Sequence, residues 1–295
     1  MEENVSDTAA EPVLPRPSST ALDIQVLGLC RFSVPSEGAF QVTHDSIEER
    51  SAMLYDPARL DKRFIWFEQV LLPAIAKQKD PQFKLIILMG EDFPEPYRAR
   101  MLAHINAVPQ LCAEFAPPLH HRKICADAMA AHIDVDADAV AEFRLDDDDA
   151  VAVDFVHRLR RDARRAKGFV RSGGPVAIDY GKGILLCVDP DGAGVTTLPR
   201  LTRYWTPALA VVIEPSHDKH ILDYEHHRLW TQMTTITLVD EVMFVRGVHG
   251  SNDSTFSLDG PAFAMSGEDA PKILKKRFQI NLASFAKAIL AAPGS

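Results

Sequence analysis

Residues 139–149 read AVAEFRLDDDD, an apolar segment followed directly by four consecutive aspartates. The apolar part has the length and composition of a buried β-strand. Adjacent aspartates repel one another, and aspartate favours neither helix nor strand. The segment therefore predicts a strand that ends at the aspartates, and these form either a solvated turn or a site for a cation.

Strand and helix patterns alternate along the chain up to this point, which is typical of a mostly parallel sheet with helices on its faces. Ligands of such sheets bind beyond the carboxyl ends of the strands, so the position of the aspartates favours a site. Apolar runs predict strands at 21–32, 83–90, 111–117 and 139–145, and helical spacing or helix-start signals predict helices at 60–78, 94–108 and 121–133.

The rest of the chain is less regular. Residues 33–60 are polar and predict a long loop, and the glycine-rich residues 171–183 predict a flexible acceptor-side loop or an ordinary turn. No sharp linker divides the chain, so we expect a disordered tail at 1–20 and a single α/β domain at 21–295. Apolar runs predict further strands at 181–189, 206–215 and 242–250, and an amphipathic helix at 271–292.

Composition narrows the classes of function. A net charge of −9 argues against nucleic acid as a main partner, because phosphate binding needs a clustered basic surface. The one dense basic run, at 157–167, predicts a solvated helix face beside the acidic residues. The first 20 residues lack the features of a signal peptide, and no apolar run is long enough to span a bilayer. We therefore expect a cytoplasmic protein.

The aspartates have two interpretations. A strand would place Asp146 and Asp148 on one side, where an Asp-x-Asp pair can share a divalent ion with water and phosphate oxygens. Mg²⁺ and Mn²⁺ prefer such oxygen ligands, and they neutralise charge on a diphosphate leaving group. Alternatively Asp149 caps a helix that follows it, although capping does not explain four aspartates in a row.

The aspartate segment, RKICADAMAAHI before it, an early CRFSVPS and a late VRGVHGSNDS resemble the bacterial putative rhamnosyltransferase family. The resemblance covers roughly residues 24–255. It implies a GT-A-like fold, a nucleotide-sugar donor, a divalent metal, and transfer to a saccharide, lipid-linked or other hydroxyl acceptor. The family's name adds rhamnose as the sugar to expect.

The resemblance also implies roles for individual residues. Asp146 matches the first carboxylate of the Asp-x-Asp motif, near the donor's ribose and the metal. Asp148 matches the second carboxylate, which is the expected direct metal ligand, and Asp149 is next to it. His249 matches a late histidine that completes the metal site or contacts the diphosphate. Arg31, at the end of the first strand, either faces the donor or forms a plain salt bridge. Gly250 and Asn252 suit a loop that passes close to the donor phosphates.

An inverting transfer also needs a base that deprotonates the acceptor hydroxyl. Glu225, in DYEHH, is our first choice; Asp179, Glu214, Asp240 and Glu241 are the other candidates. His217 and His220 share a spacing that would suit zinc if both lay on one helix, but core or surface roles are commoner for such histidines. The basic helix near the C-terminus predicts core packing or, at most, peripheral membrane contact.

Two other classes of function fit the same aspartates. A metal-dependent phosphotransferase or nucleotidyltransferase uses paired carboxylates in a similar way. A non-catalytic carbohydrate- or calcium-binding module would keep the carboxylates without turnover. The products released from a nucleotide-sugar distinguish these classes.

Overall fold

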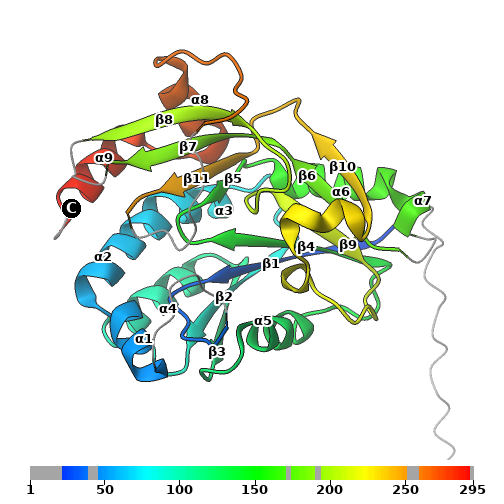
Figure 1. Cartoon of the computed structure of the whole chain (residues 1–295), viewed down its shortest axis with the longest axis horizontal. Helices are drawn as coiled ribbons and strands as arrows, with labels where there is room; N and C mark the ends of the chain where they lie inside the picture. Colours follow the sequence, from blue (N-terminus) through cyan, green and yellow to red (C-terminus); the bar gives the residue numbers. More distant parts are fainter. Residues whose placement is uncertain (1–21, 39–45, 171–173, 190–193, 251–258, 293–295) are drawn as a thin grey trace, which may run out of the picture.

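The computed structural model describes residues 22–38, 46–170, 174–189, 194–250 and 259–292. Its larger sheet has seven strands in the order β10-β6-β9-β4-β1-β2-β3 (Figure 1). Neighbouring strands are parallel except where β9 pairs with β4 and β6. The strands are β1 Ile24–Arg31, β2 Lys84–Gly90, β3 Leu111–Ala116, β4 Ala139–Asp146, β6 Val176–Tyr180, β9 Leu209–Ile213 and β10 Thr234–Leu238. The predicted α/β fold with a mostly parallel central sheet is confirmed.

A second sheet of four strands lies beside the first, in the order β5-β11-β7-β8. The chain enters it directly after the aspartates, because β5 follows β4 after a short turn and pairs antiparallel with β11. The aspartate segment therefore joins the two sheets. The strands are β5 Ala150–Val151, β7 Lys182–Val188, β8 Val195–Leu201 and β11 Phe244–Val248.

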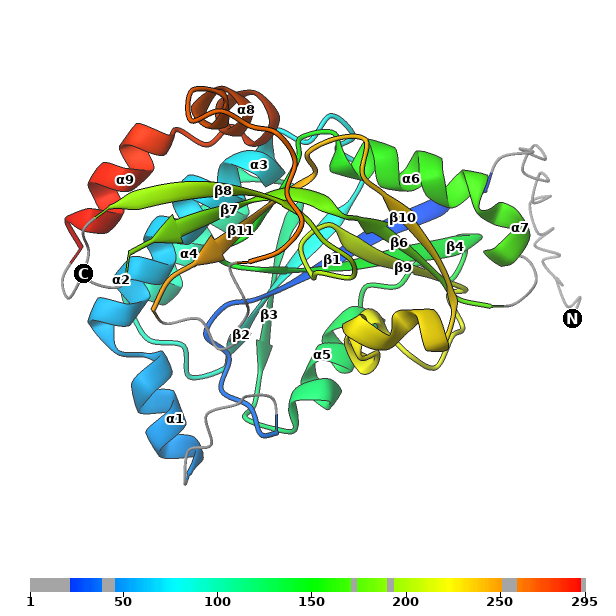
Figure 2. The same ribbon diagram turned by 45° about the horizontal axis from the view of Figure 1, so that its top comes forward.

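Side chains alternate along each strand, so the larger sheet has two apolar faces. Helices cover both of them. On β1, Ile24 and Val26 face one hydrophobic cluster, whereas Leu27 and Leu29 face another. The first cluster includes α2, α3 and α6, and the second includes α5 and the 3₁₀ turns η2 and η3 (Figure 2). These elements are α2 Pro57–Trp66, α3 Leu72–Ala76, α5 His121–Ala130, α6 Phe155–Arg165, η2 Ile221–Asp223 and η3 His226–Thr231.

Helix α2 begins earlier than predicted, and it continues through a π-helical turn, η1 Phe67–Leu71, into α3. Asp56 caps it by accepting a hydrogen bond from the backbone N–H of Arg59, and Pro57 occupies the first helical position. The predicted loop at 33–60 is therefore partly wrong, since it also contains α1 Ile47–Leu54. The glycine-rich residues 171–183 contain β6, so neither a flexible loop nor an ordinary turn describes them.

The predicted C-terminal helix is two helices, α8 Asp269–Phe278 and α9 Leu282–Leu290. Gln279 ends α8 because it adopts a left-handed conformation (φ 62°), which a right-handed helix cannot include. Leu274 and Phe278 of α8 are buried in the first hydrophobic cluster, as core packing predicts. Among the described residues, no helix combines the length and the apolar character needed to cross a bilayer.

The basic segment after the aspartates forms α6, but it is not simply a solvated face. Arg160 is buried, and its guanidinium donates hydrogen bonds to Asp80 and to the backbone oxygens of Ile24 and Gln82. The arginine therefore satisfies backbone oxygens near the start of β1. The remaining helices are α4 Tyr97–Ala107 and α7 Lys167–Val170.

We expect Gly28→Ala to destabilise the fold, because an added Cβ on β1 would lie 2.3 Å from the Phe143 ring on β4. Overpacking of this kind costs about 1–3 kcal/mol. Gly168→Ala is the matched control: no described atom lies within 4 Å of its added Cβ, and it lies in a helix. Urea denaturation should show a loss for Gly28→Ala alone; equal stability of the two variants would contradict this packing.

Candidate active site

The aspartate segment lies at the carboxyl end of β4. Asp146 is the last strand residue and pairs in register with Arg31 of β1, and the backbone N–H of Asp149 donates back to the Asp146 carbonyl at 3.0 Å. This turn ends the strand alternation, so Asp146 and Asp148 do not share one strand face as predicted. The turn directs the four carboxylates to different partners.

Asp146 forms an ion pair with Arg31, whose Nη2 donates to Asp146 Oδ1 at 2.8 Å. Burial favours protonation of Asp146, but the charges of Arg31 and Arg144 outweigh it and hold the pKa of Asp146 well below its usual range. His121 of α5 lies 3.2 Å from the other end of the Arg31 guanidinium. Burial and the charge of Arg31 lower the pKa of His121 to about 3, so this imidazole is neutral.

Asp147 is fully buried and accepts two hydrogen bonds from Arg63 of α2. Burial raises the pKa of Asp147 to about 7; the charge of Arg63 opposes the rise, and the charge of Asp148 adds to it. For Arg63, burial lowers the pKa, but Asp147 and Asp148 more than compensate and raise it. Arg63 is therefore a permanent cation inside the site.

Asp148 and His249 lie together. His249 Nε2 is 3.0 Å from Asp148 Oδ2, and Arg63 Nη1 is 3.8 Å from that oxygen and 3.5 Å from His249 Nε2. Burial raises the pKa of Asp148, yet Arg63 and His249 outweigh it, so the net shift is downward. The His249 ring also packs beside Trp66 of α2, with ring centroids 5.2 Å apart. The structure thus brings together two of the predicted metal ligands.

Gly247 of β11 shapes the wall behind Asp148. A Cβ at this position would lie 2.7 Å from Asp148 Cβ, so only glycine lets the strand approach so closely. The Gly247 backbone N–H donates to Asp149 Oδ1 at 3.2 Å. Burial, followed by the charges of Asp148 and Asp146, raises the pKa of Asp149 well above its usual value. Asp149 thus connects β11 to the turn through this hydrogen bond.

The predicted helix cap at Asp149 is wrong. Helix α6 begins at Phe155, and its N-cap residue is Asp154, which pairs instead with Arg158 and Arg277. None of the four aspartates caps α6, and their contacts are those of the turn described above.

The residues present fit a divalent ion in part. The described residues contain no group of three or more histidine, cysteine or acidic side chains able to hold a metal. Asp148 and His249 would supply two ligands, and an ion held there would take its remaining ligands from water and phosphate oxygens. Mg²⁺ is commonly bound in this way, through one or two carboxylates and substrate phosphates.

Arginines that the sequence did not single out surround Asp146. Arg144 lies two residues earlier on β4, and Arg246 lies on β11; with Arg31, both help to lower the pKa of Asp146. Arg144 Nε is buried and has no hydrogen-bond partner among the described residues. Such a concentration of guanidinium groups suits phosphate oxygens.

The other predicted donor residues are less informative. Gly250 is exposed, with no described atom within 4 Å of an added Cβ, so its backbone is open to close approach. Asn252 lies outside the described residues. Glu225 precedes η3, and its ion pairs within the described chain are with Arg228 at 3.4 Å and His227 at 3.8 Å. None of these contacts joins Glu225 to the aspartates.

Three further base candidates have evident structural partners. Asp240 and Glu241 form ion pairs with Arg158. Asp179 is buried, and its carboxylate accepts hydrogen bonds from Thr237 and from the Tyr204 backbone. Burial raises the pKa of Asp179 to about 6.

The histidine-rich segment does not form a zinc-binding helix. His217 lies in a turn before η2, and its ring contacts the backbone of Lys219. His220 Nδ1 lies 2.7 Å from the buried Glu142 carboxylate, and this hydrogen bond raises the pKa of His220. His226 lies 2.7 Å from the backbone oxygen of Tyr204. His220 and His226 are thus satisfied by buried or part-buried hydrogen bonds and His217 by a local one near the surface, the roles expected to be commoner than zinc binding.

Sequence reasoning missed Arg63 altogether. It lies in LDKRFIWF, where we considered only the apolar spacing of the helix. The available signal was its position: Phe64 and Trp66 beside it are buried, so a charge within that turn of α2 needs a buried partner.

We expect Arg63→Ala to cost about 3–5 kcal/mol of unfolding free energy, because it leaves the buried Asp147 without its partner. Chemical denaturation at neutral pH measures this loss. The double variant Arg63→Met, Asp147→Leu removes both charges and should recover most of it. A single variant as stable as the wild type would show that the pair does not hold α2 against the turn.

We expect the unfolding free energy to depend on pH because of the buried Asp179 carboxyl group. Its folded pKa of about 6 exceeds the ordinary aspartate value of 3.8, so the folded state retains a proton that the unfolded state releases. The resulting stabilisation is present below about pH 4 and is lost as the pH rises through about 6. At about 1.4 kcal/mol per pKa unit, the wild type should lose about 3 kcal/mol relative to Asp179→Asn over this range. Parallel pH dependences of the two proteins would contradict the burial argument.

Among curated proteins no match to this chain is found. Among solved structures the chain has limited similarity to several proteins. Residues 1–349 of Staphylococcus aureus TarS share 11% identity with this chain, covering 76% of it and 60% of TarS 1–349, with a TM-score of 0.36. TarS 1–349 in complex with UDP-GlcNAc gives 12% identity, 91% and 67% coverage, and a TM-score of 0.36. A nucleotide-diphospho-sugar transferase from Desulfovibrio desulfuricans G20, described as putative, shares 13% identity with this chain. The match covers 90% of this chain and 96% of that protein, with a TM-score of 0.38. The chain thus spans 60% of the first of these proteins.

A family comparison gives a more definite result. The family described as "Putative rhamnosyl transferase" matches residues 25–259. The matched region runs from β1 past β11, and it contains Arg31, Arg63, the four aspartates and His249. The chain therefore belongs to the putative rhamnosyl transferase family of glycosyltransferases.

Proposed function

We propose that the protein is a metal-dependent glycosyltransferase, which moves a sugar from a nucleotide-sugar donor to a hydroxyl group of a saccharide or lipid-linked acceptor. The observation that carries the proposal is the Asp148–His249 pair at the carboxyl ends of the parallel strands, with arginines on both sides. This edge is where ligands of open α/β sheets bind. The family name supports glycosyl transfer and, less specifically, rhamnose as the sugar.

Each group in the site has a separate task in the proposed reaction. Asp148 and His249 would hold Mn²⁺ or Mg²⁺, and the ion, when bound, would offset charge on the departing diphosphate. Arg31 fixes Asp146, and the neutral His121 beside Arg31 holds no competing charge. Arg63 fixes Asp147 and keeps the adjacent Asp148 ionised. The chain therefore presents an ionised, oriented carboxylate before the donor arrives.

The acceptor proton also needs a destination if the reaction is inverting. Glu225 remains the predicted base; its carboxylate is about half exposed, which leaves it accessible to an acceptor. Asp179 is a poorer choice, because the surrounding protein covers it and its oxygens already accept hydrogen bonds. A retaining mechanism would not need a base in this role.

Nucleotide binding that depends on metal tests the proposal. We would measure the thermal stability of the protein with a panel of nucleoside diphosphates, including UDP, with and without Mn²⁺. A ligand that binds only the native state adds about 2.7 kcal/mol at a hundredfold excess over its dissociation constant. We expect a shift when nucleotide and metal are both present.

Variants locate this binding. Asp148→Asn and His249→Ala should abolish the metal-dependent shift, whereas Asp218→Asn, at a highly exposed aspartate, should keep it. A shift of equal size in EDTA, or one that survives in Asp148→Asn, would contradict metal binding by this pair.

A further inference from the structure

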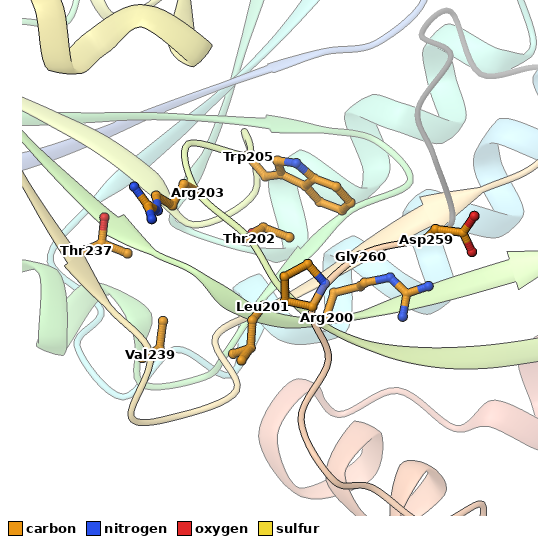
Figure 3. A pocket seen from close by; sticks show the side chains of 10 residues that line it. Arg200, Leu201, Thr202, Arg203, Trp205, Thr237, Val239, Asp259 and Gly260 are labelled. Carbon is orange, nitrogen blue, oxygen red and sulfur yellow. The ribbon is translucent and has the colours of Figure 1, made fainter.

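A cavity of about 460 Å³ lies beside the second sheet (Figure 3). Its size is in the range of small-molecule sites. The polar and aromatic side chains that line it come from the end of β8, the loop that follows, β10 and the segment after residue 258. They are Arg200, Thr202, Arg203, Trp205, Thr237 and Asp259.

Two polar atoms on this lining are buried without a hydrogen-bond partner among the described residues. They are Arg200 Nε and Thr202 Oγ1. An unsatisfied buried polar group typically costs about 1–3 kcal/mol, so such groups call for an explanation. Arg200 is held in place through Nη1, which donates to the Pro199 backbone oxygen at 2.7 Å. A ligand rich in oxygen atoms would satisfy both groups.

The loop that presents Trp205 is held in a strained conformation. Tyr204 has a positive φ of 58°, which residues other than glycine rarely adopt. Its hydroxyl lies 3.1 Å from Thr235 Oγ1, and its carbonyl oxygen lies 2.7 Å from the His226 ring. The buried Asp179 accepts a hydrogen bond from its backbone. Both sides of Tyr204 are therefore fixed, and the indole ring next to it is held in place.

Trp205 also connects this cavity to the aspartates. The guanidinium of Arg246 lies over the indole ring, 5.0 Å from its centroid. Arg246 is at the same time one of the charges that act on Asp146 and Asp149. Arg246 of β11 thus contacts the cavity lining and also acts electrostatically on the acidic site.

We propose that this cavity binds the acceptor, and that the acceptor is a saccharide carrying a carboxylate or a phosphate next to its ring. The indole face offers apolar area to the ring hydrogens of a sugar. Arg200 and Arg203 line the cavity with two positive charges. The carboxylates near them are Asp259 in the lining and the buried Asp179, on which Arg203 acts. The anionic group is therefore assigned to Arg200, whose Nε has no partner among the described residues. This inference rests on the proposed glycosyl transfer and names the acceptor class for it.

Direct binding to the full chain, without nucleotide, tests the inference. The probes are glucuronic acid for the carboxylate, glucose 6-phosphate for the phosphate, and glucose as the neutral match, each titrated by ligand-observed NMR. We expect at least one anionic probe to bind at least tenfold more tightly than glucose. Tighter binding of glucuronic acid assigns a uronic acid, and tighter binding of glucose 6-phosphate assigns a phosphosugar. Equal binding of all three probes, or no binding, overturns the proposal.

Variants place the binding in the cavity. Trp205→Leu and Arg200→Gln should each weaken the anionic probe at least fivefold. Trp230→Leu, at an exposed tryptophan that is not part of the cavity lining, should leave it unchanged. Binding that is unaffected in both cavity variants overturns the proposal.

The metal-dependent nucleotide shift separates the two claims. If wild-type protein binds nucleotide but no anionic sugar, the acceptor inference fails and glycosyl transfer stands. If it binds an anionic sugar in this cavity but no nucleotide with any metal, the donor site fails instead.

Discussion

Four adjacent carboxylates lie at one turn, three of them buried and Asp146 partly exposed, and the structure depends on giving each of them a partner. Asp146 has Arg31 from β1, Asp147 has Arg63 from α2, Asp148 has His249 after β11, and Asp149 has the backbone N–H of Gly247. These partners come from segments far apart in the sequence. The turn consequently ties the first sheet, the second sheet and α2 together at one point.

Buried ion pairs contribute little net stability, because desolvation offsets most of the attraction. Their effect here is to define geometry: removing either partner leaves an uncompensated charge, so the arrangement is difficult to vary. The pairing also divides the aspartates by chemistry. Asp146 and Asp147 are bound to arginines, whereas burial and the neighbouring carboxylates raise the pKa of Asp149. Asp148 is ionised and faces a histidine, which makes it the carboxylate best suited to a metal.

Much of the first half of the fold could be predicted from sequence, because its strands are buried on both faces and give continuous apolar runs. β1, β2 and β3 lie within the predicted ranges, and β4 runs one residue past its range, to Asp146. β8 and β10 were missed because their residues are mostly half-buried or exposed and include threonines, proline and arginine, which weaken the apolar signal. β6 was obscured by the glycines before and after it.

The site shows the same limit. The aspartates and His249 could be identified because their residue types and the family resemblance mark them. Arg31 was also named, as a donor contact or a salt bridge. Arg63, Arg144 and Arg246 were not, since a cation on a helix or strand gives no local sign of which carboxylate it will meet. Arg63 is 84 residues from Asp147, and only the fold brings the two together. The break at Gln279 was missed for a related reason, because no glycine or proline marks this left-handed residue.

The measurement that tests the central claim most directly is product analysis after incubation with nucleotide-sugars and Mn²⁺. Anion-exchange chromatography separates nucleoside diphosphate from nucleoside monophosphate and pyrophosphate. Glycosyl transfer by this site predicts nucleoside diphosphate in equal amount to the transferred or hydrolysed sugar, with turnover lost in Asp148→Asn. Release of pyrophosphate would contradict the account and identify nucleotidyl transfer, and turnover that persists in Asp148→Asn would show that the chemistry lies elsewhere.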